Sequence, residues 1–302
     1  MLFKLIFTPW FLALPFFGCA QVIPDSLAYF SQSPPGLTPE IFAPGIISKE
    51  DEFEFGSVFT ADGTEFFYAV NVNNKAEIRY TKLANSQWTA PERIIYHDQY
   101  GYNDPFLSPD EQKLYFISKQ PLNKKGAEKD YDLWYAEKQT DGWSEPINAG
   151  RTVNSDSNEY YISFTDEEKL YFASNIHATQ RGDYDIYASQ HINGQFQTPQ
   201  RLSDSVNTPN YEADVFVAYD ESYLIYCGER KGGFGRGDLY ISFRKSDGSW
   251  TTAQNMGDAI NTLNYEFCPF VTKDGKYLFY SSNQDIYWVS AEVIDQLQDD
   301  YE

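Results

Sequence analysis

Cysteine and histidine are scarce in this chain of 302 residues, with three of each. The histidines His97, His177 and His191 stand apart from the cysteines, and none belongs to an HExxH motif. Transition-metal sites need such ligands in clusters. We therefore expect no metal and no other cofactor. A Gly-x-Ser-x-Gly motif is missing as well, which argues against a serine peptidase with a nucleophile elbow.

Positive charge is also scarce. The chain has 23 Lys and Arg against 44 Asp and Glu, which gives a formal net charge of −21. Phosphate groups are repelled by such a surface, so we expect no charge-driven binding of nucleic acid or anionic lipid. An acidic, soluble surface is the simplest interpretation. Attraction of a cation or a basic partner is the alternative.

The N-terminus has the pattern of a targeting segment over residues 1–20. A short positive start at Met1–Lys4 precedes an apolar stretch at Leu5–Phe17 that is too short for a convincing transmembrane helix. Cleavage after Ala20 would leave a soluble product, whereas Phe16–Cys19 resembles a bacterial lipobox, with Cys19 as a lipid anchor. We expect a bacterial protein that is exported to the periplasm, the outer membrane or the medium, monomeric and without a transmembrane segment in its mature form.

Only Cys227 and Cys268 then remain in the folded body. A domain of this size does not depend on disulfides for its stability. Two buried, unpaired thiols are one interpretation, and a single disulfide between them is the other.

A phrase of about ten residues recurs five times, approximately every 54 residues. Examples are Phe59–Tyr68, Leu107–Phe116 and Val271–Tyr280. Its turn aspartates are Asp62, Asp110, Asp166, Asp220 and Asp274. A period of this size indicates an array of supersecondary units, each too small to bury a core alone.

Each repeat reads as four hairpin-linked antiparallel strands, which is typical of a β-propeller blade. Five copies of the first three strands occur, but only four copies of the fourth follow residue 50. The missing fourth strand matches Leu37–Phe42, so we expect an N-terminal strand to close the ring. The prediction is an all-β, five-bladed propeller over residues 37–291, with a lead-in at 21–36 and an acidic tail at 292–302. Six blades, the alternative, would need a further copy of the repeat.

The repeated turn followed by Leu-Tyr-Phe, with a later Asp-Ile-Tyr as at Asp185–Tyr187, resembles the WD40-like repeats of TolB-type β-propellers. The resemblance covers residues 37–290. It implies a propeller fold and is compatible with a periplasmic interaction protein. Fold-level likeness by itself does not define an activity.

Carboxylates recur at the start of the first strands. Glu54, Glu159, Glu212 and Glu266 occupy the same repeat position, and Asp104 and Asp214 lie two residues beyond it in their blades. Alternate residues of a strand share a side, so these groups could form a ring at the channel mouth. We expect the repeated glutamates to be structural acceptors of backbone N–H bonds from the neighbouring blade. Asp104 and Asp214, which the repeat does not require, are the candidate binding residues.

Two functions follow from these patterns. The first is an exported, non-enzymatic binding or scaffold propeller that engages a protein, peptide or glycan through its loop-rich face. Phe234 and Arg236, in a glycine-rich loop at 230–237, are further candidate contacts. The alternative is a carbohydrate-active enzyme resembling five-bladed glycoside hydrolases, with Glu54, Asp104 and Glu159 as its carboxylates.

Overall fold

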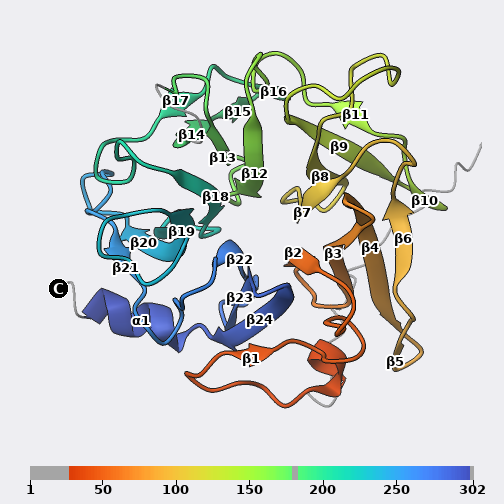
Figure 1. Cartoon of the computed structure of the whole chain (residues 1–302), viewed down its shortest axis with the longest axis horizontal. Helices are drawn as coiled ribbons and strands as arrows, with labels where there is room; N and C mark the ends of the chain where they lie inside the picture. Colours follow the sequence, from red (N-terminus) through yellow and green to blue (C-terminus); the bar gives the residue numbers. More distant parts are fainter. Residues whose placement is uncertain (1–26, 179–182, 300–302) are drawn as a thin grey trace, which may run out of the picture.

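Five antiparallel sheets form a closed ring around a central channel in the computed structural model, which describes residues 27–178 and 183–299 (Figure 1). The innermost strand of each sheet lies at the centre of the ring and the outermost at its rim. The prediction of an all-β, five-bladed propeller is therefore confirmed. Residues 1–20 and Cys19 lie outside the described residues.

Four blades follow one another along the chain. Blade 1 contains β2 (Glu54–Phe59), β3 (Glu65–Val72), β4 (Lys75–Ala84), β5 (Gln87–Trp88) and β6 (Glu92–Ile95). Blade 2 contains β7 (Asn103–Leu107), β8 (Lys113–Ser118), β9 (Asp132–Gln139), β10 (Gly142–Trp143) and β11 (Ile147–Asn148). Blade 3 contains β12 (Glu159–Phe164), β13 (Leu170–Ser174), β14 (Asp185–Ser189), β15 (His191–Ile192), β16 (Gln195–Phe196) and β17 (Gln200–Arg201). Blade 4 contains β18 (Glu212–Val217), β19 (Tyr223–Gly228), β20 (Asp238–Phe243) and β21 (Gln254–Asn255).

The fifth blade joins the two ends of the propeller. It combines β22 (Phe267–Val271), β23 (Tyr277–Ser282) and β24 (Asp285–Ser290) with the N-terminal strand β1 (Glu40–Ile41). Strand β1 runs antiparallel to β24, with Glu40 opposite Trp288. Because β1 covers the backbone edge of β24, the predicted closure by an N-terminal strand is confirmed.

Proline interrupts the outermost strand of three blades. Pro91, Pro146 and Pro199 lie between the two short pieces of that strand in blades 1, 2 and 3. Proline has no backbone N–H to donate to a ladder, so it is tolerated at a sheet edge and splits the strand there. The fourth strands of blades 1, 2 and 3 are thus interrupted strands, whose first halves end at Trp88, Trp143 and Phe196.

Both described ends of the chain pack against the propeller. The ring of Tyr29, in the short helix η1 (Ala28–Ser31), contacts the ring of Trp288 at a centroid distance of 5.5 Å. The expected acidic tail instead begins with a helix, α1 (Glu292–Asp299), which lies at the rim of the ring (Figure 1). Val293 and Ile294 are buried, and this apolar contact explains why the segment is ordered into a helix.

The two faces of the propeller differ in their loops. We call one the loop face; it carries the leading loops, which precede the innermost strands, and the loops between second and third strands. The other, the hairpin face, carries the turns between first and second strands. Aspartates cap those turns: Asp62 accepts a hydrogen bond from the N–H of Thr64 at 3.0 Å, beside Gly63 in the left-handed region at φ 69°.

Candidate functional site

One residue of each innermost strand adopts a left-handed backbone at the same repeat position. These residues, which we call the channel ring, are Gly56 (φ 54°), Asp104 (55°), Tyr161 (49°), Asp214 (52°) and Cys268 (50°). The register of each innermost strand shifts here, as in a β-bulge. A bulge re-aims the side chain of the extra residue. The two predicted binding residues, Asp104 and Asp214, therefore occupy equivalent places in blades 2 and 4.

Side chains of the channel ring meet across the channel. The thiol of Cys268 donates to Oδ1 of Asp104 at 3.3 Å, and the hydroxyl of Tyr161 donates to the carbonyl of Pro269 at 2.8 Å. A Cβ on Gly56 would lie 3.2 Å from both Cα and Oδ1 of Asp104. Glycine is therefore required where the Asp104 side chain passes blade 1. The channel is filled with packed side chains at this level.

Burial dominates the electrostatics of the ring. It raises the pKa of Asp104 to about 7 and that of Asp214 well above its usual range, and the neighbouring charge of Asp104 raises the latter further. Cys227 and Cys268 are both buried, free thiols, as the first interpretation expects. Burial raises their pKa values too, so they are protonated and chemically quiet near neutral pH.

The repeated glutamates are held by their own leading loops. Glu159 accepts hydrogen bonds from the N–H and the hydroxyl of Ser155, at 3.1 and 2.6 Å, and from the hydroxyl of Ser174 at 3.0 Å. Glu266 makes the same three contacts with Thr262 and Ser282. These donors do not come from the neighbouring blade, contrary to the sequence-based expectation. These hydrogen bonds stabilise the turn that precedes each innermost strand.

Asparagines of the same loops make the contact with the neighbouring blade instead. Oδ1 of Asn154 accepts from the N–H of Leu133 at 2.7 Å, and Asn207 and Asn261 do the same for the third strands of blades 3 and 4. Each asparagine side chain accepts a hydrogen bond from a backbone N–H that has no partner within its sheet. Adjacent blades are thereby tied together on the loop face.

Two of the repeated glutamates depart from this pattern. Opposite Glu212, the second strand has Gly228 where blades 3 and 5 have a serine. The guanidinium of Arg230 lies 3.5 Å from Oε1 of Glu212 instead. In Glu54 the corresponding position is Val70, and the buried Oε2 has no hydrogen-bond partner. Burial raises the pKa of Glu54 to about 7. Glu54, Asp104 and Glu159 thus sit in three different environments.

The glycine-rich loop at 230–237 is tied to blade 5. The backbone N–H of Arg236 donates to the carbonyl of Asn264 at 2.9 Å, while Asp238 accepts from the N–H groups of Phe234 and Gly235. Phe234 is 43% exposed, and Leu263 of the adjoining leading loop is 86% exposed. The two loops approach closely, since a Cβ added to Gly235 would lie 3.0 Å from the backbone carbon of Leu263, a neighbour that the sequence analysis did not identify.

Aromatic side chains form a chain of contacts around the channel on the loop face. We call this set the aromatic mouth: Phe53, Phe55, Tyr131, Tyr160, Tyr184, Tyr211, Tyr265 and Phe267. Centroid distances are 4.7 Å for Tyr131–Tyr160, 5.1 Å for Tyr160–Tyr184 and 5.6 Å for Tyr184–Tyr211. The hydroxyls of Tyr211 and Tyr265 lie 3.0 Å apart, and Phe267 links Tyr265 to Phe55.

Sequence reasoning missed the aromatic mouth, although a signal for it exists. An aromatic residue directly flanks the repeated glutamate in four blades, as in Phe53 and Phe55 around Glu54 and Tyr265 and Phe267 around Glu266. The remaining two members, Tyr131 and Tyr184, each precede the aspartate that starts a third strand. Only ring closure shows that these separate positions converge.

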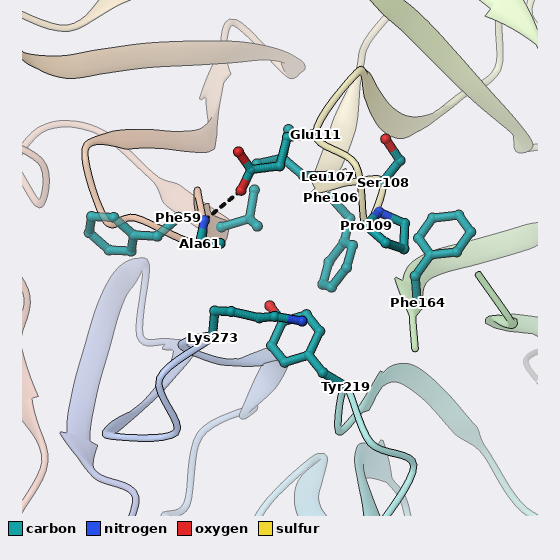
Figure 2. Close-up of a pocket in the computed structure, with 11 residues that line it drawn as sticks. Phe59, Ala61, Phe106, Leu107, Ser108, Pro109, Glu111, Phe164, Tyr219 and Lys273 are labelled. Carbon is teal, nitrogen blue, oxygen red and sulfur yellow. Dashed lines mark hydrogen bonds between the residues drawn. The ribbon is translucent and has the colours of Figure 1, made fainter. Parts of the chain in front are cut away.

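A small cavity lies at the other end of the channel, on the hairpin face (Figure 2). Phe106 and Phe164 line it, Glu111 accepts a hydrogen bond from the N–H of Ala61, and Lys273 extends over the ring of Tyr219 at 3.9 Å. Its volume of about 30 Å³ can hold one or two water molecules. That volume is far below the several hundred Å³ typical of a small-molecule site.

Two features are absent from residues 27–178 and 183–299. Among these residues, no group of three or more His, Cys, Asp or Glu is arranged to hold a metal ion. Within the same residues no helix is long and apolar enough to span a bilayer.

Comparison with known proteins reveals likeness at the level of fold. No protein-family model and no curated protein matches the sequence. TolB from Acinetobacter baumannii is 14% identical, with a TM-score of 0.51 over 78% of this chain and 53% of that protein. The chain thus spans about half the length of that relative. It shares the β-propeller fold of TolB-type proteins.

Two other similar structures have lower TM-scores. A TolB from Agrobacterium tumefaciens is 14% identical, with a TM-score of 0.47 over 76% of this chain and 70% of that protein. Oligogalacturonate lyase from Vibrio parahaemolyticus is 12% identical, with a TM-score of 0.42 over 85% of this chain and 98% of that protein. Likeness of this degree concerns the fold alone, so function must be argued from this chain's own residues.

Proposed function

We propose that the protein is an exported, non-enzymatic binding or scaffold propeller that engages a protein, peptide or glycan through its loop face. The observation behind this proposal is the distribution of exposed apolar side chains. Those in or directly beside the loops of the loop face are Ile46, Val72, Tyr96, Leu122, Ile176, Phe234 and Leu263. In the described chain, no large hydrophobic side chain is exposed in the turns between first and second strands, and away from the loop face Ile192 is exposed in the β15–β16 hairpin. Exposed apolar groups favour a surface that a partner covers.

The environments of the carboxylates support a non-enzymatic role. Glycoside hydrolysis requires two carboxyl groups that flank one accessible bond. Glu159 accepts hydrogen bonds from three donors of Ser155 and Ser174. Glu54 is fully buried, and Asp104 is packed into the channel ring. The alternative enzyme would therefore lack a pair of carboxylates that faces solvent together.

Binding assays with matched variants test this proposal. Envelope proteins, peptides and polysaccharides are screened with the wild type and with Phe234→Ser/Leu263→Ser, and Ile192→Ser serves as the control. Ile192 is 51% exposed but lies in the β15–β16 hairpin, away from the loop face. We expect the double variant alone to lose the partner. Hydrolysis of a substrate that is abolished by Asp104→Asn or Glu159→Gln would overturn the proposal in favour of the enzyme.

Export is part of the same proposal, and it rests on the pattern of residues 1–20. Mass spectrometry of the N-terminus of natively expressed protein tests it. A free or cyclised Gln21 identifies a soluble product, and a diacylglyceryl group on Cys19 identifies a lipoprotein. Full-length protein retained in the cytoplasm contradicts both routes.

A further inference from the structure

The aromatic mouth lies on the loop-face side of two buried carboxyl groups. Asp104 and Asp214 belong to the channel ring, with only 6% and 5% of their surface exposed. Tyr160 and Phe267 directly precede Tyr161 and Cys268 of the channel ring on strands that enter from the loop face, so their backbone positions lie nearer that face than the channel ring does. The aspartates therefore form the floor of the mouth.

The carboxyl groups of this floor have few bonding partners. Asp104 receives a weak thiol hydrogen bond from Cys268, and Asp214 receives a backbone hydrogen bond from the same residue. Among the described residues, no ion pair within 4.0 Å involves either aspartate, although fifteen such pairs occur elsewhere. Buried carboxylates in proteins are normally paired. A cation supplied from outside would complete the arrangement.

Aromatic rings provide the second element of a cation site. The faces of tyrosine and phenylalanine rings attract ammonium and guanidinium groups within about 6 Å, and more strongly where water is excluded. The protein already uses this interaction at the mouth, where the ammonium of Lys119 lies 4.6 Å from the centroid of Tyr131. Phe53, Phe55, Tyr160 and Phe267 are partly exposed and available to an incoming group.

We propose that the aromatic mouth binds a lysine or arginine side chain presented by a partner peptide, above the floor formed by Asp104 and Asp214. Charge complementarity favours this occupant over a neutral sugar, because the whole chain carries a net charge of −21 and a bound cation favours the ionised form of the floor carboxyl groups. The inference rests on the proposed function and specifies the chemistry of its partner.

Calorimetric titration with a matched pair of peptides tests the inference. The probe is an Ala-Arg-Ala-Arg-Ala peptide with blocked ends, and its control carries citrulline, the neutral isostere of arginine, at both positions. We expect the arginine peptide to bind at least about tenfold more tightly than the citrulline peptide. The preference should shrink in high salt, which screens charge. Equal binding of the two peptides, or no binding of the arginine peptide, overturns the inference.

Variants locate the site. Asp104→Asn/Asp214→Asn should weaken the arginine peptide about tenfold, and so should Phe55→Leu, which removes a ring and keeps apolar volume. Phe55→Leu leaves the buried carboxylates in place, so it remains informative if the aspartate variant does not fold. Tyr96→Leu is the control, because this ring is 51% exposed and outside the mouth. Unchanged affinity in Phe55→Leu overturns the inference.

The outcomes separate this inference from the proposed function. If the loop face binds a partner that Phe234→Ser/Leu263→Ser abolishes, while the mouth variants bind it normally, the proposed function stands and the mouth is not its site. If a neutral oligosaccharide competes for the mouth better than the arginine peptide, a glycan is the occupant and the inference is wrong. Hydrolysis of either probe would instead contradict the proposed function.

Discussion

The thiol of Cys268 in blade 5 donates a hydrogen bond to the carboxylate of Asp104 in blade 2, at 3.3 Å between Sγ and Oδ1. The contact spans blade 1, which lies between these two blades in the closed ring and contributes Gly56 at the same level. It is possible because both residues occupy bulged positions that re-aim their side chains. Two residues that are 164 positions apart in sequence therefore connect blades 2 and 5 through the channel.

Replacing Gly56 should destabilise the whole ring. Alanine in Gly56→Ala would have to adopt φ 54° and place its Cβ 3.2 Å from Asp104. We expect a cost of about 1–3 kcal/mol in the free energy of unfolding, measured by denaturant titration. Gly36→Ala is the control, since no atom lies within 4 Å of its added Cβ. Equal stability of the two variants would contradict the need for glycine in the channel ring.

Removing a repeated glutamate should cost stability without affecting other blades. Glu159→Ala leaves the N–H and hydroxyl of Ser155 and the hydroxyl of Ser174 without their acceptor. Buried donors left unpaired cost about 1–3 kcal/mol. Thermal unfolding compared with Glu145→Ala, whose side chain is 89% exposed, checks the prediction. A similar melting temperature for both variants would mean that the leading loop does not depend on this acceptor.

The melting temperature should rise as the pH is lowered from about 8 to about 5. Burial raises the pKa of Asp104, Glu54 and Glu159 to about 7, above the values near 4 of an unfolded chain. Between these values the folded chain binds more protons than the unfolded chain, so the free energy of unfolding falls as pH increases. Calorimetry at constant ionic strength measures the slope. Asp104→Asn should have a shallower slope, and a wild-type melting temperature that increases with pH would contradict the assignment.

Deleting residues 27–45 should leave the fifth blade with an open edge. The deletion removes β1 and the buried ring of Phe42, which contacts Phe279 and Trp288 at 5.0 and 5.3 Å. An uncovered strand edge promotes aggregation. We expect a lower melting temperature and oligomers in size-exclusion chromatography. Ile41→Ser is the matched control, because it keeps the backbone of β1 and alters a side chain that is 36% exposed. A truncated protein that melts like this control would show another mode of closure.

The order of strands and the closure of the ring follow from local signals in the sequence. The turn at Asp62–Gly63 and its copies specify hairpins, and the match of Leu37–Phe42 to later fourth strands identifies the missing strand. Such signals are short-range and repeated, so a single chain contains enough information to count five blades. The helix over Glu292–Asp299 escaped this reasoning, because its apolar contacts are with a blade surface that exists only after folding.

The candidate site was determined by tertiary structure. Alternation along an ideal strand placed Asp104 and Asp214 in one ring with the repeated glutamates, but the bulges turn the aspartates toward Cys268 and separate the two sets. Tyr131 and Tyr184 precede the first aspartate of a third strand, whereas Tyr160 flanks a repeated glutamate, and neighbouring members of this set lie about 25–30 residues apart. Their rings meet because the blades converge on one axis, a geometric consequence of closure that no local pattern encodes. The sequence by itself therefore determined the repeating scaffold, and only the packing of five blades decided which side chains face one another at its centre.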